Sequence, residues 1–102
     1  MINLNYNFEW DLEKAVQNEK KHKISFEQAA SIFSDPRALT IFDDEHSINE
    51  DRWITIGMSN KGNIVVTIHT FKEEANNSNT IRIISSRKAT KKEIEQYLSD
   101  II

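Results

Sequence analysis

Arg82-Ile83-Ile84-Ser85-Ser86-Arg87-Lys88-Ala89-Thr90-Lys91-Lys92 is the stretch in which a predicted strand passes into a predicted helix. Its first half is rich in β-branched isoleucine, which favours a strand. Alternation along that strand would place Arg82, Ile84 and Ser86 on one face. Thr90-Lys91-Lys92-Glu93 then has the form of a capping box, in which the hydroxyl and the carboxylate each bond a backbone N–H. A C-terminal helix is therefore expected to begin just after Thr90.

The same stretch concentrates positive charge. It holds five cations and no carboxylate: Arg82, Arg87, Lys88, Lys91 and Lys92. Two of these lysines fall in the first helical turn, where the helix dipole disfavours a cation by roughly 0.3–1 kcal/mol. A helix start with a purely structural role would more often carry Asp or Glu there. We therefore expect this turn to meet phosphates or the carboxylates of a protein partner.

Length and composition restrict the class of protein. A chain of 102 residues has room for one domain, over residues 1–102. The net charge of −3 argues against indiscriminate nucleic-acid binding but is compatible with a local basic patch. The absence of cysteine excludes disulfides, thiolate catalysis and cysteine metal sites. No run approaches the roughly 20 apolar residues of a membrane span, and no signal-peptide core opens the chain, so a soluble, cytoplasmic protein is expected.

Two helices are predicted in the first third of the chain. Asp11 is a good N-cap for a helix over residues 12–22, because its carboxylate can accept a free backbone N–H. Ser25-Phe26-Glu27-Gln28 has the form of a second capping box, and Asp35-Pro36 would stop the helix that it opens. Helical spacing in the first helix predicts an inner face of Leu12, Ala15 and Val16 beside a polar stripe of Lys14, Asn18, Lys21 and His22.

Residues 1–7 are interpreted as a short strand or arm. Alternating hydrophobicity predicts four further strands, over residues 38–42, 52–58, 64–71 and from 81 onward. The segments between them are predicted to be an acidic loop, a tight hairpin and a longer loop: residues 43–51, 60–62 and 72–79. Consecutive strands joined by short turns are usually antiparallel neighbours. The predicted fold class is α+β: two N-terminal helices, a four-stranded antiparallel meander and a C-terminal helix, with the helices on one face of the sheet.

The second face of that sheet would stay open. Strand alternation gathers an aromatic ring, hydroxyls, an imidazole and a guanidinium there: Trp53, Thr55, Thr67, His69, Arg82 and Ser86. On such a face Trp53 could stack a nucleobase. Two other interpretations of Trp53 stay open, an anchor for a protein partner and simple core packing.

Several segments together resemble one known family. They are Phe8-Glu9-Trp10-Asp11, Lys14-Ala15 with Asn18, Lys21-His22, Ile24-Ser25-Phe26-Glu27 with Ala29, Asp35-Pro36, Glu50-Asp51-Arg52 with Ile56-Gly57, Val65-Val66 with His69-Thr70, and Arg82-Ile83-Ile84-Ser85 with Arg87-Lys88-Ala89. Over nearly the whole chain they resemble the BrnT family of toxins from type II toxin–antitoxin systems. The resemblance implies a RelE-like α+β ribonuclease that cleaves RNA without metal and is neutralised by a small BrnA antitoxin, which also represses their shared operon. Operator DNA would then be contacted only through the antitoxin complex, an assembly that leaves room for a toxin dimer.

Metal-independent RNA cleavage needs a base for the 2′-OH and cations on the developing negative charge. Arg82 and Arg87 could supply the cations, because guanidinium groups bind phosphate in bidentate geometry. The alternative for Arg82 is an ion pair with Glu50 or Asp51 from the acidic loop. Such an ion pair would give Arg82 a structural role in place of a catalytic one.

Histidine and lysine complete the catalytic candidates. His69 could act as acid or base, because imidazole titrates near neutrality. Its alternative is a half-buried strand residue bonded to a neighbouring threonine. The resemblance adds Lys21 and His22, although cations at a helix C-terminus also have a structural explanation.

The predicted RNA contacts are Lys88, Lys91, Lys92, Trp53, Thr67 and Ser86. No metal site and no cofactor are expected, because the three histidines are scattered at no ligand-like spacing. Two rival functions remain. The first is a non-catalytic module whose basic turn grips an acidic protein partner. The second is a DNA-contacting regulator, which no recognition-helix pattern supports.

Overall fold

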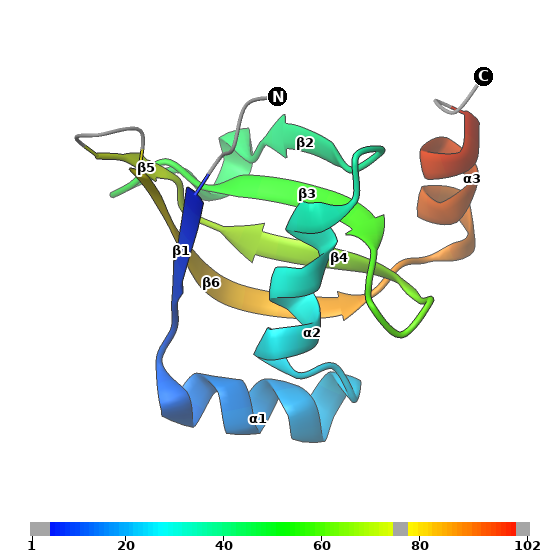
Figure 1. The fold of residues 1–102 in the computed structure, drawn as a ribbon, viewed down its shortest axis with the longest axis horizontal. Helices are drawn as coiled ribbons and strands as arrows, with labels where there is room; N and C mark the ends of the chain where they lie inside the picture. The colour runs from blue at the N-terminus through cyan, green and yellow to red at the C-terminus, as the bar shows by residue number, and fades with distance from the viewer. Residues whose placement is uncertain (1–4, 75–77, 100–102) are drawn as a thin grey trace.

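The structure is a computed structural model that describes residues 5–74 and 78–99. These residues form three α-helices and a mixed six-stranded sheet (Figure 1). In chain order the elements are β1 (Asn5–Glu9), α1 (Leu12–His22), α2 (Phe26–Ser31), η1 (Ile32–Ser34), β2 (Leu39–Phe42), η2 (Asp44–His46), β3 (Trp53–Met58), β4 (Ile64–His69), β5 (Lys72–Glu73), β6 (Ser78–Lys88) and α3 (Lys91–Ser99). The α+β class is thereby confirmed.

The predicted helix caps are confirmed. Lys14 N–H donates to Asp11 Oδ1 at 3.0 Å, and Gln28 N–H donates to Ser25 Oγ at 3.1 Å. Both halves of the Thr90 capping box form, since Thr90 N–H donates to Glu93 Oε1 and Glu93 N–H donates to Thr90 Oγ1. Within the described ranges no helix has the length and apolarity to cross a membrane.

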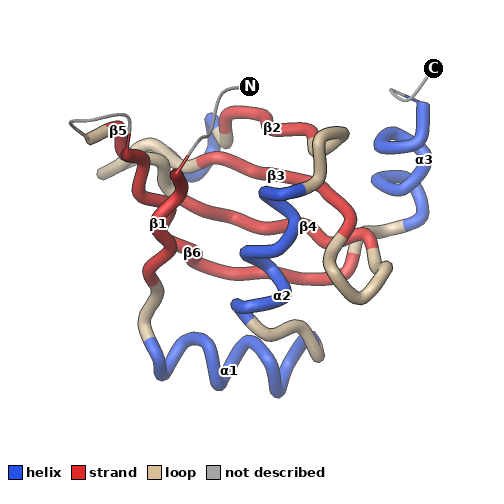
Figure 2. The backbone as a smooth tube through the Cα atoms, viewed as in Figure 1, coloured by secondary structure: helices blue, strands red, loops and turns tan. Residues whose placement is uncertain are grey.

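The sheet departs from the predicted meander in strand number and direction. Its order is β1-β6-β4-β3-β2, with β5 also paired to β6 (Figure 2). The four predicted strands do pair as antiparallel neighbours, but β1 adds a parallel strand at the edge of β6. Residues 72–79 were predicted to be a loop, and that prediction is wrong at Lys72–Glu73 and from Ser78 onward. The rest of that loop, residues 75–77, lies outside the described part of the chain.

A β-bulge in β6 changes which side chains share a face. Ile68 pairs with Ser85 but His69 pairs with Ile83, so Ile84 is an extra residue without a partner on β4. An extra residue reverses the alternation of side chains beyond it. Ser86 therefore faces the same side as its partner Thr67, whereas Arg82 faces the opposite side. The prediction that Arg82 and Ser86 share a face is wrong.

Helices pack on both faces of the sheet, not on one as predicted. The first core joins residues of the α1–α2 region to the sheet: Ile24, Phe26, Ala29 and Ile32 against Val65, Ile81 and Ile83. The second core places Tyr97 of α3 against Ile56 and Val66 on the other face. In Figure 1, α2 crosses the sheet while α3 stands apart at its end. The face predicted to be open is thus largely covered.

Helix α1 contacts the sheet largely through Asn18 of its polar stripe, so the prediction of its inner face is wrong in part. Of the predicted inner residues, Ala15 packs against the core, but Leu12 and Val16 are 78% and 53% exposed. Asn18 is buried instead, and its amide donates to Ser86 O at 2.9 Å and to Ile24 O at 3.1 Å. Asn18 Oδ1 also accepts from Ser86 N–H at 3.1 Å. One side chain therefore pairs with the edge of β6 where β1 has ended, and this contact orients α1.

Candidate functional site

Arg82 meets a carboxylate on the face of the sheet opposite α2. Arg82 Nη2 forms an ion pair with Glu50 Oε1, and Arg52 Nη2 lies 4.0 Å from the same oxygen. All three side chains are between 35% and 42% exposed, so solvent and ligands can reach them. The structural alternative for Arg82 is present, and it also brings a carboxylate and two guanidinium groups to one point.

The loop that carries Glu50 is closed at its neck by three hydrogen bonds. Asp43 N–H donates to Arg52 O at 2.8 Å, Arg52 N–H donates to Ser47 Oγ at 2.9 Å, and Ser47 Oγ–H donates to Asp43 O at 2.6 Å. Arg52 directly precedes β3, so the sheet fixes one end of the loop. The closed neck holds Glu50 over β6 at the level of Arg82.

A groove of about 270 Å³ lies between this cluster and the first turn of α1. Its charged walls come from Asp11, Lys14, Glu50, Arg52 and Arg82. The Nε atom of Arg52 is buried and has no hydrogen-bond partner among the described residues. The groove therefore combines three cations with two carboxylates, of which Asp11 caps α1 and Glu50 pairs with the arginines. Such a grouping is suited to holding an anion and removing a proton beside it.

Sequence reasoning missed this grouping although signals for it existed. Glu50 and Arg52 stand in the Glu50-Asp51-Arg52 segment, and Lys14 stands beside Ala15, both parts of the family resemblance. The sequence could not show that the loop, β6 and α1 converge. Among the described residues no three side chains of His, Cys, Asp or Glu gather in a way that could hold a metal ion.

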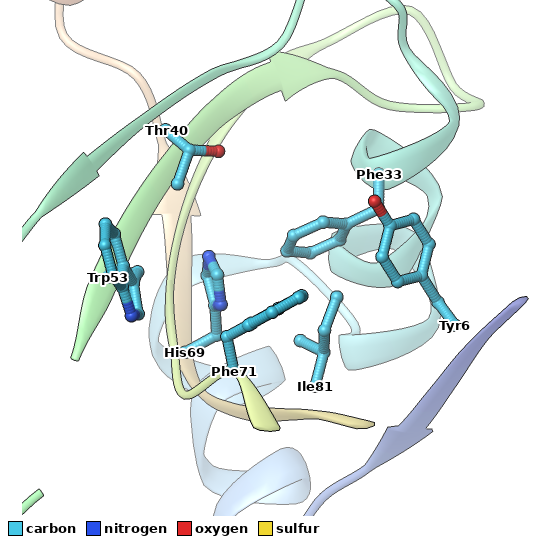
Figure 3. A pocket seen from close by; sticks show the side chains of 7 residues that line it. All are labelled: Tyr6, Phe33, Thr40, Trp53, His69, Phe71 and Ile81. Carbon is cyan, nitrogen blue, oxygen red and sulfur yellow. The ribbon is translucent and has the colours of Figure 1, made fainter. Parts of the chain in front are cut away.

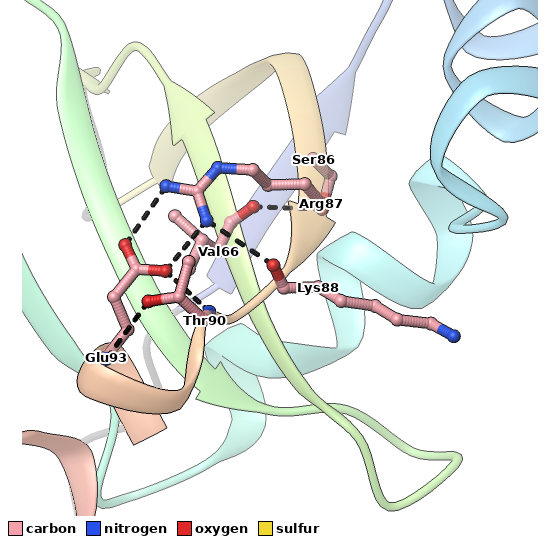
Figure 4. Close-up of polar contacts among 6 residues, drawn as sticks. All are labelled: Val66, Ser86, Arg87, Lys88, Thr90 and Glu93. Atoms are coloured by element: carbon pink, nitrogen blue, oxygen red, sulfur yellow. Dashed lines mark hydrogen bonds and ion pairs between the residues drawn. The ribbon is translucent and has the colours of Figure 1, made fainter. Parts of the chain in front are cut away.

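Arg87 belongs to a separate cluster at the start of α3 (Figure 4). Its Nη1 and Nη2 donate to the two carboxylate oxygens of Glu93 at 2.7 and 3.0 Å. The hydrogen bonds from Arg87 lower the pKa of Glu93 to about 2, and the same pair raises the pKa of Arg87. Five residues of strand separate Arg87 from Arg82, about 15 Å. The two arginines therefore do not meet at one phosphate, contrary to the prediction.

The low pKa of Glu93 predicts a pH-dependent contribution to stability. A carboxylate whose pKa is depressed on folding stabilises the protein above its unfolded value of 4.5, and this contribution disappears as pH falls towards 2. The wild type should exceed Glu93→Gln in free energy of unfolding at pH 7, and the two should converge between about pH 5 and pH 2. Urea unfolding across this range measures the difference. Glu95→Gln, an exposed change on the same helix, is the control, and a constant gap down to pH 2 would contradict the prediction.

His69 is sealed inside the protein, so the prediction of an open-face histidine is wrong. It is 2% exposed, its ring packs edge-on against Phe33 at 4.9 Å, and both ring nitrogens are engaged. Nδ1 donates to Thr70 O at 3.0 Å, and Nε2 accepts from the Thr55 hydroxyl at 2.7 Å. Burial lowers the pKa of His69 and favours this neutral form. The placement fits the alternative of a threonine-bonded strand residue and gives no support to a catalytic role.

The remaining candidates do not converge on the groove. Thr67 and Ser86 are buried and bond each other at 3.0 Å, out of reach of a ligand. Lys21 and His22 lie in the last turn of α1, about 10 Å along the helix from Lys14. Lys88, Lys91 and Lys92 are exposed around the start of α3. Trp53 packs against Phe42 at 5.0 Å and lines an apolar pocket on the other face of the sheet.

Comparisons with known proteins show the family and the fold of the chain. Residues 10–93 match the family described as ribonuclease toxin, BrnT, of type II toxin–antitoxin system. Among solved structures, the chain is similar to the crystal structure of the Brucella abortus ribonuclease toxin BrnT, with a TM-score of 0.57 and 22% identity over 85% of this chain and 99% of that one. No protein of curated description matches the sequence. The likeness in structure establishes the fold, and the matched residues include every charged member of the groove.

Proposed function

This chain belongs to the BrnT family of ribonuclease toxins of type II toxin–antitoxin systems, and from that premise we propose that it cleaves RNA in the groove at Arg82. The observation that carries the proposal is the position of Glu50, whose carboxylate lies between the guanidinium groups of Arg82 and Arg52. A base next to two phosphate-binding cations is what RNA self-cleavage requires.

The proposed reaction uses the 2′-OH of the RNA as nucleophile. Glu50 takes the proton of the 2′-OH, and the 2′-oxygen then forms a bond to the adjacent phosphorus. Arg82 and Arg52 bind the phosphate oxygens and stabilise the negative charge that grows on them. The bond from phosphorus to the 5′-oxygen breaks, and that oxygen takes a proton from water. The hydroxide that remains takes the proton from Glu50, which restores the carboxylate. The products are a 2′,3′-cyclic phosphate and a free 5′-OH.

Lys14 supplies a third positive charge to the same groove. Its place depends on α1, because Asp11 caps the helix one turn before it and Asn18 docks the helix one turn after it. We assign Lys14 to the phosphate or to a neighbouring one, as a positioning contact. Helix α1 thus contributes to the site through its first turn, while its last turn carries Lys21 and His22 away from the groove.

Family membership implies an antitoxin partner. We propose that this partner is BrnA-like, that operator DNA is contacted only through the complex, and that a toxin dimer forms within it. Lys88, Lys91 and Lys92 are assigned to the backbone phosphates of RNA, because all three are exposed and because Lys91 and Lys92 lie in a first helical turn, where a structural helix start would carry acids. A RelE-like relationship of the fold belongs to the same proposal.

The experiment that tests this function is an RNA cleavage assay in EDTA. Purified chain, freed of antitoxin, should cut single-stranded RNA in the presence of the chelator, and end-group analysis should find a cyclic phosphate. The matched control is the same RNA with a 2′-deoxynucleotide at the cut position, which should resist cleavage because the nucleophile is missing. Loss of activity in EDTA, or products ending in a 3′-OH, would contradict the mechanism. Intact RNA would favour the rival of a non-catalytic binding module.

A further inference from the structure

The structure has a second hollow that the proposed reaction does not use. An apolar pocket of about 300 Å³ opens on the α2 face of the sheet (Figure 3). Aromatic rings dominate its lining: Tyr6, Phe33, Trp53, His69 and Phe71 surround it with Thr40 and Ile81. The volume is at the lower end of the roughly 300–1,000 Å³ typical of ligand pockets. Such a space suits one flat, aromatic group.

The pocket and the Arg82 groove lie back to back at one end of the sheet. Trp53 directly follows Arg52 along β3, and Ile81 directly precedes Arg82 along β6, so each pair points to opposite faces. Phe71 follows β4 and connects the two sides. It lines the aromatic pocket, and it also lines a polar hollow of about 510 Å³ whose walls carry Lys72 and Arg82 together with four carboxylates, those of Glu9, Glu50, Asp51 and Glu74.

The walls suit a nucleobase better than an aliphatic side chain. Nucleobases stack on aromatic rings whatever their sequence, and each stacked base is worth roughly a 5- to 150-fold change in affinity. The Thr40 hydroxyl already bonds Thr55 Oγ1 at 2.8 Å. The hydroxyl of Tyr6 and the indole N–H of Trp53 offer hydrogen-bonding groups at the edge of a stacked base (Figure 3). His69 cannot do so, because both of its nitrogens are already bonded.

From this continuity, and resting on the proposed function, we propose that the aromatic pocket binds the base of a nucleotide next to the scissile phosphate. The phosphate lies at Arg82 on one face, and the RNA strand turns around the end of β4 at Phe71. The neighbouring base then enters between Tyr6, Trp53 and Phe71. This pocket gives the enzyme its preference for single-stranded RNA, because a paired base cannot leave its helix to enter.

The test uses single-stranded RNA oligonucleotides in which one nucleotide at a time is abasic. For the full chain, kcat/KM should fall about ten-fold or more when one particular position beside the cut loses its base, and little elsewhere. Phe71→Ala should cut the intact RNA about ten-fold more slowly and should lose its sensitivity to that position. Phe71 is 45% exposed, so the change should leave the fold intact. Leu98→Ala, an equally exposed apolar change on α3, should keep the wild-type pattern.

A binding measurement separates the pocket from the cleavage reaction. The two tryptophans are Trp10 and Trp53, so Trp10→Phe leaves Trp53 as the fluorescent reporter. Adenosine, guanosine, cytidine and uridine are titrated against it, and at least one should quench the emission. This result would support the pocket even if the chain cuts no RNA, an outcome that would reject the proposed function alone.

Three results would overturn the proposal. The first is cleavage at a rate that no abasic position changes, which would leave the nuclease in place without a base pocket. The second is the absence of quenching by every nucleoside. The third is a Phe71→Ala variant that cuts every oligonucleotide like the wild type but escapes inhibition by the antitoxin, which would assign the pocket to that protein.

Discussion

Glu50→Gln is expected to lower the kcat of RNA cleavage by about 10²–10⁴-fold, the usual contribution of a positioned general base. Arg82→Ala should lower it by about 10²–10³-fold, because it removes a cation from the developing negative charge. Both side chains are partly exposed, and their ion pair is worth at most about 1 kcal/mol of stability. Single-turnover cleavage, with circular dichroism to verify folding, measures both effects.

Arg87→Ala is the matched control for Arg82→Ala. Both residues are half-exposed arginines of β6 and each is paired with a glutamate. Arg87 lies outside the groove, so its replacement should change the rate by less than about three-fold and mainly affect the docking of α3. Equal losses of cleavage rate in the two variants would contradict the assignment of the active site to the Arg82 groove. They would favour a site that both arginines share.

Asn18→Ala is expected to destabilise the protein by about 3 kcal/mol. The change removes three hydrogen bonds and leaves the buried N–H and C=O of Ser86 without their partner, at about 1–3 kcal/mol for each unsatisfied group. For a domain of this size that corresponds to a fall in Tm of about 10–20 °C. Urea unfolding gives the free energy directly, provided that the slope with denaturant stays constant.

Gln17→Ala tests whether this effect belongs to the docked amide. Gln17 is an exposed amide on the same helix, and its removal should change the free energy of unfolding by less than about 0.5 kcal/mol. If the two variants were equally stable, the docking of α1 would rest on something other than Asn18. Activity provides a second readout, since a loosened α1 would also displace Lys14 from the groove.

Local features of the fold were predictable because their causes are local. The caps at Asp11, Ser25 and Thr90 and the α1 bounds of residues 12–22 follow from side chains that bond their own neighbours. Antiparallel pairing from β2 to β4 follows from alternation and short connections. A short strand or arm was expected over residues 1–7, but the parallel pairing of β1 with β6 was not predicted, because it joins residues more than 70 positions apart.

The helices and strands were easier to predict than the side chains that each of them turns towards the core. Strict alternation along β6 predicted the wrong face for Arg82 relative to Ser86, because the bulge at Ile84 reverses the alternation of side chains beyond it. Hydrophobic spacing in α1 failed because Asn18, a polar residue, makes the contact with the sheet. Thr67 and His69 were expected on an open surface and are buried for a third reason: the α2–η1 segment covers the face that they share, with Phe33 packed on the His69 ring.

The sequence predicted only part of the candidate site, because the rest depends on contacts between distant segments. Arg82 stood out through the cluster of positive charge and through the family resemblance. An ion pair of Arg82 with Glu50 or Asp51 was the structural alternative to catalysis, and the pair with Glu50 is present. Its proposed role as a base becomes apparent only when Arg52 and Lys14 are seen around the same groove, and that convergence depends on contacts between distant segments.

The closed neck of the Glu50 loop has an evolutionary consequence. Asp43, Ser47 and Arg52 tie its ends together, so the tip can lengthen, shorten or change composition without disturbing the register of β3. The entropic penalty of a longer tip grows only slowly with its length. On the proposed function, which places the base Glu50 in this loop, substitutions at the tip would change the cleavage rate while the scaffold beneath keeps its ability to fold.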